Sequence, residues 1–371
     1  MIKYVDFIEQ HRPHTKDLQK IFIKTLQSGN FILGPELSKF EKNFSSYIGV
    51  NHSIGVSNGT SALYLSLKYL DFPKGSEIIT IGNSYLAAVS TIFLAGLKPI
   101  FADIGDDLNI DLNDVEKKIT KKTKAIVIVH LTGQPANMQK ALYLKKKYNL
   151  KIIEDCSQAV GAMYYNKKVG TFGDVGCFSL HPLKNLGAIG DAGIITTNNS
   201  KMANFLKKAR NHGHSSRDQC EFWSFNMRLD PLQASILNFK LSHLDKIIQK
   251  RINNAKYYIA KLSKICISTP TEKNYLKNVY QSFIIRVKYR DKLKKYLETK
   301  KIETKIHVKI NSNKLIAAKR YKLNLIELKN TDKFNKEILS LPISETLKRK
   351  DQKIIIKYVE KFYKEKIYEK Y

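Results

Sequence analysis

Two hydrophobic periods alternate along most of the chain. Short apolar runs rich in β-branched residues predict strands, and most of the stretches between them space their apolar residues as amphipathic helices do. The predicted strands are SIGV (53–56), EIITIG (77–82), KPIFAD (98–103), AIVIVH (125–130), KIIEDC (151–156), GCFSL (176–180) and AGIITT (192–197). The predicted helices cover residues 36–47, 61–70, 84–96, 111–120 and 138–148. Apolar strands separated by helices are typical of a parallel sheet covered on both faces, so we expect a large α/β domain over residues 1–240 with a mostly parallel seven-stranded sheet.

The pattern changes after about residue 235. A long lysine-rich helical stretch leads to the apolar run VYQSFIIRVK (279–288), a helix near 291–299, the strand-like TKIHVKI (304–310) and an amphipathic helix over 348–364. These elements predict a smaller α+β C-terminal domain over residues 241–371, joined to the first domain by a long helix.

Composition places the chain among globular proteins. Its 371 residues, 43% of them hydrophobic, are enough for one large core or two smaller ones. The first residues lack a sustained apolar stretch, and no later run reaches eighteen apolar residues, so we expect a soluble, cytoplasmic protein with no membrane partner. The four cysteines have neither C-x-x-C pairing nor metal-ligand spacing, which predicts reduced thiols and no metal site.

The formal net charge of +31 allows three interpretations. A strongly basic net charge is also typical of nucleic-acid-binding proteins. Here the lysines are spread along the chain and arginine, the usual base-reading residue, is scarce. We therefore favour a lysine-rich compositional habit and expect no nucleic-acid partner, while affinity for an anionic substrate fits the same charge.

Three segments carry candidate chemistry. In SNGTSALYLSL, Gly59 and Thr60 begin a helix directly after a strand, where free backbone amides suit a phosphate group, although an ordinary Ser/Thr helix cap explains the same letters. In KIIEDCSQAVGA, an apolar strand ends at Glu154 and Asp155, and ligands of open α/β sheets bind outside such strand ends. A structural pairing of Asp155 with a lysine is the alternative.

The third segment, FSLHPLKNLGAIGDAG, surrounds Lys184 with small, apolar and turn-forming residues. A desolvated lysine in such a turn loses its proton readily and can act as a nucleophile or base, whereas a solvated loop lysine is the plain alternative. A phosphate cradle, then an acid at a strand end, then a lysine in a glycine-rich turn is the order in which a fold type I protein meets pyridoxal 5'-phosphate (PLP).

The combination of these segments with NFILGPELSKFE, NSYLAAVSTI, FNMRLDPLQAS and ILSLPIS resembles the DegT/DnrJ/EryC1/StrS sugar aminotransferases over almost the whole chain. The resemblance implies the PLP-dependent aminotransferase fold of type I. It implies that Lys184 is the Schiff-base lysine and that Asp155 is the partner of the pyridine nitrogen.

The remaining cofactor ligands that the resemblance implies are Gln158 at the ring hydroxyl, Tyr85 stacked on the ring, Gly59, Thr60 and Ser179 at the phosphate, and Asn226 reaching the phosphate from the neighbouring subunit. The site is then completed only in a homodimer. Each residue has a plainer alternative, such as a core aromatic for Tyr85 or a turn residue for Asn226. His181, Arg228 and His307 are candidates for substrate contacts.

The implied reaction passes the amino group of L-glutamate, through the pyridoxamine phosphate form of the cofactor, to a ketone on a nucleotide-linked sugar. KNLGAIGDAG is similar to the version of this segment in enzymes that aminate C3, so we expect a dTDP-3-keto-6-deoxyhexose substrate and a 3-amino-3,6-dideoxyhexose product for surface glycans, polysaccharides or glycosylated metabolites. A C4 aminotransferase and a UDP-3-keto-sugar aminotransferase are the alternatives. Lys184 argues against the related dehydratases, which carry histidine there.

Two departures concern the sugar pocket. The HYPxPxH-like segment of relatives reads TKIHVKINSNKL here and retains only His307, and Ser344 stands where relatives end LSLPMH with histidine. A function from a different class also stays open: a basic nucleic-acid-binding regulator built on an inactive aminotransferase scaffold, which would show salt-sensitive DNA binding.

Overall fold

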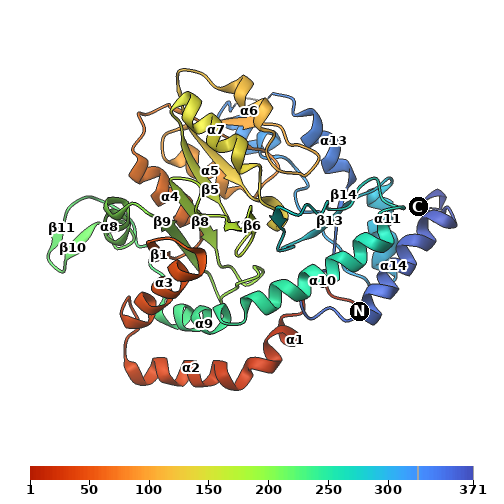
Figure 1. The fold of residues 1–371 in the computed structure, drawn as a ribbon, viewed down its shortest axis with the longest axis horizontal. Helices are drawn as coiled ribbons and strands as arrows, with labels where there is room; N and C mark the ends of the chain where they lie inside the picture. The colour runs from red at the N-terminus through yellow and green to blue at the C-terminus, as the bar shows by residue number, and fades with distance from the viewer. Residues whose placement is uncertain (324–325, 371) are drawn as a thin grey trace.

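The computed structural model describes residues 1–323 and 326–370, and a seven-stranded sheet forms its centre (Figure 1). The strand order is β1-β9-β8-β5-β4-β2-β3. Pairing is parallel from β8 through β5, β4 and β2 to β3, whereas β9 runs antiparallel to both β1 and β8. The strands are β1 (His52–Val56), β2 (Glu77–Ile81), β3 (Lys98–Ala102), β4 (Thr123–Val129), β5 (Lys151–Asp155), β8 (Val175–Ser179) and β9 (Gly193–Thr197). The prediction of a mostly parallel seven-stranded sheet is confirmed.

Helices cover both faces of this sheet because successive strand residues point to opposite sides. Ile78 packs with α4 (Gly59–Leu70), α5 (Ala87–Leu94) and α8 (Ser200–Ala209) on one face. The next residue, Ile79, packs with α6 (Leu112–Lys118) and α7 (Met138–Tyr148) on the other face. That second face continues under β8 and β9 as a cluster with α3 (Pro35–Ile48) and α9 (Pro231–Leu241). The core is therefore two apolar layers with the sheet between them.

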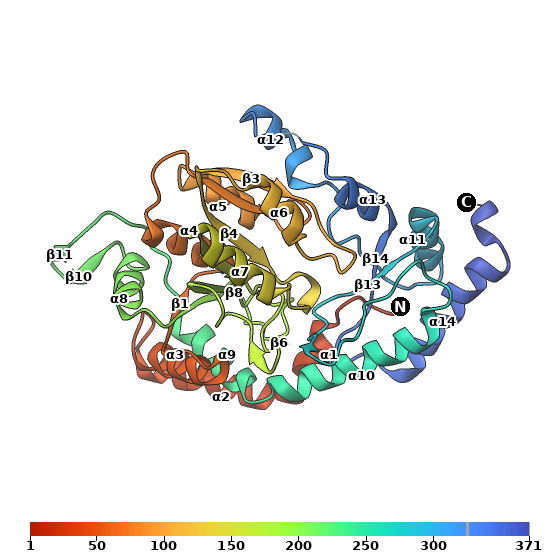
Figure 2. The same cartoon turned by 45° about the horizontal axis from the view of Figure 1, so that its top comes forward.

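The C-terminal part has a core of its own. The helix α10 (Leu244–Leu262) leads away from the large sheet to an antiparallel pair, β13 (Phe283–Arg286) and β14 (Ile338–Leu341), which packs with α11 (Arg290–Thr299) and α14 (Arg349–Lys364). The beginning of the chain joins this part, since Ile2 pairs with Ile302 (Figure 2). The division into domains at residue 240 stays a prediction.

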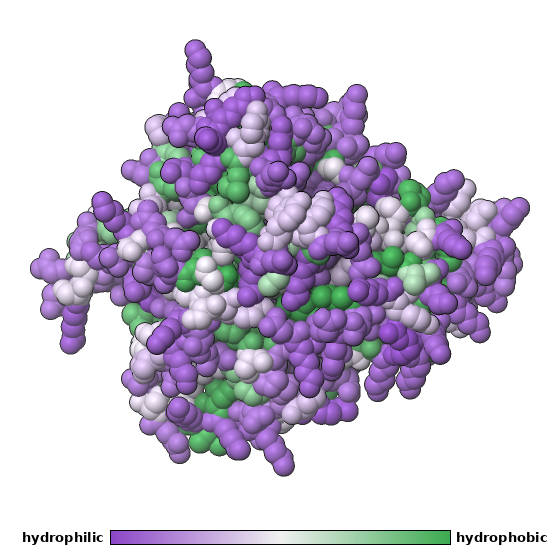
Figure 3. Space-filling view, viewed as in Figure 1, coloured by the Kyte–Doolittle hydropathy of each residue, from purple (hydrophilic) through white to green (hydrophobic). Residues whose placement is uncertain are grey.

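The remaining elements complete the described chain. They are α1 (Phe7–His11), α2 (Thr15–Ser28), β6 (Met163–Tyr164), β7 (Lys167–Lys168), β10 (His214–Ser216), β11 (Gln219–Cys220), β12 (Leu276–Lys277), α12 (Ile316–Arg320) and α13 (Lys329–Glu337), with single 3-10 turns between some of them. None of the helices in the described ranges has an apolar stretch sufficient to span a bilayer. The face seen in Figure 3 is mainly hydrophilic, with smaller groups of apolar side chains among the polar ones.

Two local predictions were wrong. Residues 304–310 form no strand: only Lys305 pairs with Ser340, through backbone hydrogen bonds of 3.1 and 2.8 Å, after which the backbone leaves β14 and lines a cavity. The helix expected over 84–96 begins only at Ala87, so Tyr85 precedes the helix. The helix α2 was not predicted; its apolar residues Phe22, Ile23 and Leu26 are each about half exposed.

Candidate active site

A cavity of about 220 Å³ lies where the carboxyl ends of the central strands face the C-terminal part of the chain. Segments far apart in the sequence form its wall, and the wall contains no carboxylate. It is lined by Tyr4, Val5, Tyr85, Gln158, Leu183, Lys184, Arg251, Gln281, Ser282, Lys305, Ile306, His307, Val308, Ile343 and Ser344. The cavity thus brings together four of the predicted site residues: Lys184, Tyr85, Gln158 and His307.

Lys184 lies in a tight turn after β8. The turn is closed by a backbone hydrogen bond of 2.8 Å from the amide of Lys184 to the carbonyl of His181. Gly187 is required here, because a Cβ on it would lie 2.5 Å from the carbonyl oxygen of Pro182. Burial lowers the pKa of Lys184, and the negative charge of Asp155 opposes that shift. The side chain is therefore easier to deprotonate than an ordinary lysine.

Asp155 ends β5 and is only 6% exposed. Its Oδ1 accepts a hydrogen bond of 3.0 Å from the amide of Ser157, and within the described chain no hydrogen bond reaches Oδ2. The carboxylate is close enough to Lys184 to influence its pKa electrostatically, although the two groups form no ion pair. A second oxygen thus remains for a ligand at this strand end.

The neighbouring acid, Glu154, belongs to the core. Its Oε1 accepts hydrogen bonds from the amides of Phe172 (2.8 Å) and Gly173 (2.7 Å). Its Oε2 accepts from the amide of Gly170 (2.8 Å) and lies 3.1 Å from Nε2 of His130. Because the other ring nitrogen of His130 accepts a hydrogen bond from a backbone amide, Nε2 carries the proton and donates. Glu154 is fully buried and holds the loop after β7 in place.

Gln158 is oriented by the turn that follows β4. Its Oε1 accepts a hydrogen bond of 2.8 Å from the amide of Thr132, a residue in the left-handed region with φ of 63°. This bond fixes which end of the side-chain amide faces the turn, so Nε2 is the group available to the cavity.

The amino end of α4 is seated closely against the end of β8. Asn58 caps the helix by accepting a hydrogen bond of 2.8 Å from the amide of Ser61, so the hydroxyl of Thr60 is not used as a cap. A Cβ on Gly59 would lie 2.8 Å from Cβ of Ser179, and only glycine allows this approach. The predicted phosphate ligands Gly59 and Ser179 are therefore adjacent at a helix amino end that favours anions.

Tyr85 and His307 both line the cavity. Tyr85 is 74% exposed and forms no described contact that fixes its ring. Burial, together with the charges of Lys184 and Lys305, lowers the pKa of His307 to about 4. His307 is consequently neutral at pH 7 and can donate or accept a hydrogen bond there.

Seven predicted residues are not part of the wall of this cavity: Asp155, Gly59, Thr60 and Ser179, described above, and His181, Asn226 and Arg228. His181 is exposed, and its Nδ1 accepts a hydrogen bond from the amide of Leu183. Asn226 is exposed, and Arg228 donates a hydrogen bond of 3.1 Å to Asn211. Both belong to the segment 211–228, which carries β10 and β11 and projects from the body of the molecule (Figure 1). The same segment carries Trp223, which is 95% exposed.

Sequence reasoning missed the residues that the rest of the chain adds to the wall. Gln281 donates to the carbonyl of Leu183 (2.8 Å) and accepts from the amide of Asn185 (3.0 Å), so it holds both neighbours of Lys184. Arg251 forms a buried ion pair of 2.9 Å with Glu345. These residues have no motif of their own, and only tertiary contacts reveal them.

The residues present fit PLP. A lysine amine with a lowered pKa reaches the cavity, a buried carboxylate with one uncommitted oxygen ends the central strand, and a glycine allows close approach at a helix amino end. Lys184 would hold the cofactor covalently, and Gly59, Thr60 and Ser179 would surround its phosphate.

Comparison with known proteins agrees with this geometry. The model of the DegT/DnrJ/EryC1/StrS aminotransferase family matches residues 13–360. The dTDP-3-amino-3,6-dideoxy-alpha-D-galactopyranose transaminase of Aneurinibacillus thermoaerophilus is 38% identical over 363 residues, covering 98% of this chain and 99% of that protein. The UDP-2-acetamido-2-deoxy-3-oxo-D-glucuronate aminotransferase of Pseudomonas aeruginosa is 33% identical, covering 96% and 98%.

A solved structure extends the comparison to three dimensions. The crystal structure of S. venezuelae DesV in complex with a ketimine intermediate superposes with a TM-score of 0.94 at 31% identity, covering 97% of this chain and 98% of that one. The chain therefore belongs to the DegT/DnrJ/EryC1/StrS aminotransferase family and is a PLP-dependent sugar aminotransferase.

Proposed function

We propose that the protein transfers the amino group of L-glutamate to C3 of a dTDP-linked 3-keto-6-deoxyhexose, giving a dTDP-3-amino-3,6-dideoxyhexose. The observation that carries the chemistry is the amine of Lys184, which lines the cavity and whose pKa is lowered by burial although the charge of Asp155 opposes that shift. The choice of sugar is supported by the 38% identical transaminase, which is named for a dTDP-3-amino-3,6-dideoxyhexose.

Three side chains have separate roles at the cofactor. PLP, when bound, supplies an electron sink for the carbanion at the donor's α-carbon. The amine of Lys184 would move the proton between that α-carbon and C4′ of the cofactor, as general base and then general acid. The carboxylate of Asp155 would keep a proton on the ring nitrogen, and Nε2 of Gln158 would donate to the ring hydroxyl oxygen.

The proposal includes a homodimer. Asn226 and Arg228 lie on the projecting segment 211–228 and do not line the chain's own cavity, so we assign Asn226 to the cofactor phosphate of the neighbouring subunit. The half-exposed apolar residues of α2 are further surface for a second copy to cover.

The nucleotide and the ring position are the finer parts of the proposal. His307, neutral at pH 7, is assigned to a sugar hydroxyl, and His181 and Arg228 are assigned to the outer part of the substrate. A UDP-linked 3-keto-sugar is the alternative that the P. aeruginosa relative favours. Amination at C4 is the remaining alternative.

Absorbance spectroscopy followed by product analysis tests the proposal. We expect the PLP-loaded protein to absorb near the visible edge and to lose that band on addition of L-glutamate. It should then regain the band with a dTDP-3-keto-6-deoxyhexose and release the 3-amino product, identified by NMR. Turnover only with the UDP-linked or the 4-keto substrate would replace the proposed sugar with that alternative.

A pair of lysine variants isolates the role of Lys184. We expect Lys184→Ala to lose roughly 100- to 10,000-fold in turnover, the range of a general acid and base. The matched control is Lys201→Ala, at an exposed position at the start of α8, which should keep wild-type turnover. Full activity in Lys184→Ala would refute the assignment.

A further inference from the structure

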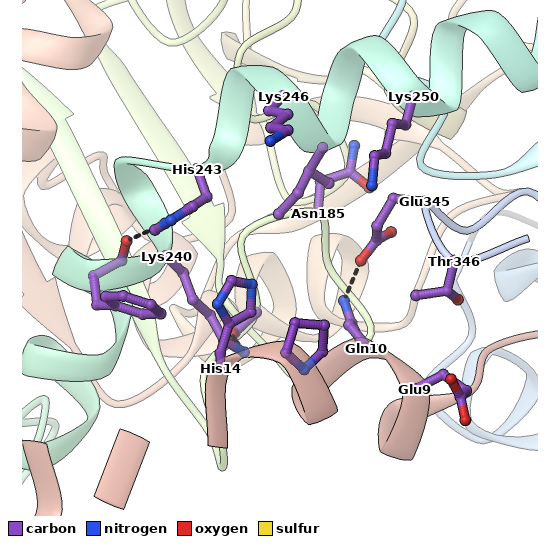
Figure 4. A pocket seen from close by; sticks show the side chains of 14 residues that line it. Glu9, Gln10, His14, Asn185, Lys240, His243, Lys246, Lys250, Glu345 and Thr346 are labelled. Atoms are coloured by element: carbon purple, nitrogen blue, oxygen red, sulfur yellow. Dashed lines mark hydrogen bonds between the residues drawn. The ribbon is translucent and has the colours of Figure 1, made fainter. Parts of the chain in front are cut away.

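A second and larger cavity, of about 450 Å³, lies between the first helical turns of the chain and the start of α10 (Figure 4). Consecutive residues of the chain line the two cavities. Lys184 and Ser344 line the catalytic cavity, and the residues that follow them, Asn185 and Glu345, line the second cavity. The two cavities are thus neighbours.

The charge in this second cavity is uncompensated. Two lysines of α10, Lys246 and Lys250, line the cavity together with His243, which precedes the helix. Both lysines lie on the side of α10 that faces the first turns of the chain (Figure 4). Across the described chain neither lysine has an ion pair or hydrogen-bond partner. The two carboxylates of the wall are already paired, Glu9 with Arg12 at 2.8 Å and Glu345 with Arg251 at 2.9 Å. The lysines therefore favour an anion.

Two oxygen atoms of the wall lack the donors that they need. Asn185 is 4% exposed, and its Oδ1 is buried without a hydrogen bond from any described residue, whereas its amide nitrogen donates to the carbonyl of Val279. Oε1 of Gln10 is likewise buried and unpaired, while its Nε2 donates to Glu345 at 2.7 Å. Buried acceptors are costly unless a donor meets them, so a ligand that carries hydroxyl groups would satisfy them.

The wall also offers apolar surface, where the ring of His14 lies 5.3 Å from that of Phe239 in an edge-on arrangement. We propose that this cavity is a binding site for a phosphate-bearing polyol, a sugar phosphate or a nucleotide, separate from the catalytic cavity. Lys246 and Lys250 hold the phosphate oxygens, and ligand hydroxyls donate to Asn185 and Gln10. This proposal rests only on the residues that line the second cavity and does not depend on which sugar the enzyme aminates.

Calorimetric titration of the PLP-loaded protein tests the site, with inorganic phosphate, glucose 1-phosphate and dTDP as probes. The test variant is Lys246→Gln/Lys250→Gln. The matched control is Lys261→Gln/Lys264→Gln, which removes the same charge at the far end of α10, from positions that do not line the cavity. We expect glucose 1-phosphate to bind the wild type more tightly than inorganic phosphate does. The test variant should bind it at least tenfold more weakly, and the control within twofold of wild type.

The dTDP titration separates the two ligand sources. Binding of dTDP at two sites per chain, one of which disappears in the test variant, would indicate a nucleotide site, and binding at a single site that the variant retains would indicate a sugar phosphate. Equal binding by the test and control variants would overturn the proposal. So would a test variant that raises KM for the nucleotide-sugar without removing a second binding event, because the lysines would then belong to the catalytic site. These readouts use binding, so they remain informative if the proposed transamination fails.

Discussion

Glu154 and Asp155 are adjacent buried carboxylates, and we predict that neutralising them has opposite consequences. Glu154→Gln should destabilise the fold and leave the cofactor chemistry in place. In glutamine one of the two oxygens becomes an NH2 group, which cannot accept a hydrogen bond. Each oxygen of Glu154 now meets two donors, so either orientation of the amide leaves two buried donors without an acceptor.

The size of the effect follows from those two lost bonds. A hydrogen bond to a charged group contributes about 1.5–3 kcal/mol, so Glu154→Gln should lower the free energy of unfolding by about 3–6 kcal/mol. Asp155 accepts only one hydrogen bond from the described residues, from the amide of Ser157, and asparagine can still accept it through Oδ1. Asp155→Asn should therefore change the free energy of unfolding by less than about 1 kcal/mol.

Urea unfolding followed by circular dichroism at 222 nm, at one protein concentration and on protein freed of PLP so that cofactor affinity does not contribute, measures both variants against the wild type. Turnover with L-glutamate and the keto-sugar supplies the second readout, in which Asp155→Asn should lose most of its activity and Glu154→Gln, below its unfolding range, little. A Glu154→Gln protein as stable as the wild type, or an Asp155→Asn protein that is the less stable of the two, would refute this division of roles.

Three further predictions concern single contacts. Gly59→Ala should weaken PLP binding at least tenfold in equilibrium dialysis, because the new Cβ would meet Ser179 at 2.8 Å and displace the amino end of α4; unchanged affinity would contradict this role. Gln281→Leu removes both hydrogen bonds that hold the neighbours of Lys184, so the pH midpoint of the visible band of bound PLP should shift, and an unmoved midpoint would show that Gln281 does not position the lysine. Burial lowers the pKa of Lys240 to about 8, so the unfolded chain binds this proton between that pH and about 10.5 while the folded chain does not. The free energy of unfolding should therefore increase with pH across that window, by up to about 3 kcal/mol more in the wild type than in Lys240→Met. Parallel pH profiles of the two proteins would argue against a lowered pKa of Lys240.

The large sheet could be predicted from the sequence because its strands are buried on both faces and therefore read as uninterrupted apolar runs. TKIHVKI has a similar alternation but forms no strand, since the backbone departs from β14 after one residue pair to bring His307 to the cavity. The helix α2 was missed although Leu18, Ile21, Phe22 and Leu26 are spaced as in an amphipathic helix. Its exposed apolar residues show that part of this face does not pack into the chain's own core.

The candidate site divides in the same way. Lys184 and Asp155 could be proposed from local signals, a glycine-rich turn and a strand end, whereas Gln158 was proposed only from the family resemblance. Gln281, Arg251 and Tyr4 could not, because they reach the cavity from parts of the chain brought there only by tertiary packing. The structural role of Glu154 could not be predicted either, because the backbone amides that it binds lie in a loop sixteen to nineteen residues further along the chain.

Trp223 makes the projecting segment 211–228 observable without a label. It is the single tryptophan of the chain, its side chain is 95% exposed, and it lies three residues before Asn226. Indole emission moves to shorter wavelength when water is excluded from the ring. The wavelength of maximum tryptophan emission therefore reports mainly whether another surface covers this segment. Measuring that wavelength in a dilution series would follow subunit association directly.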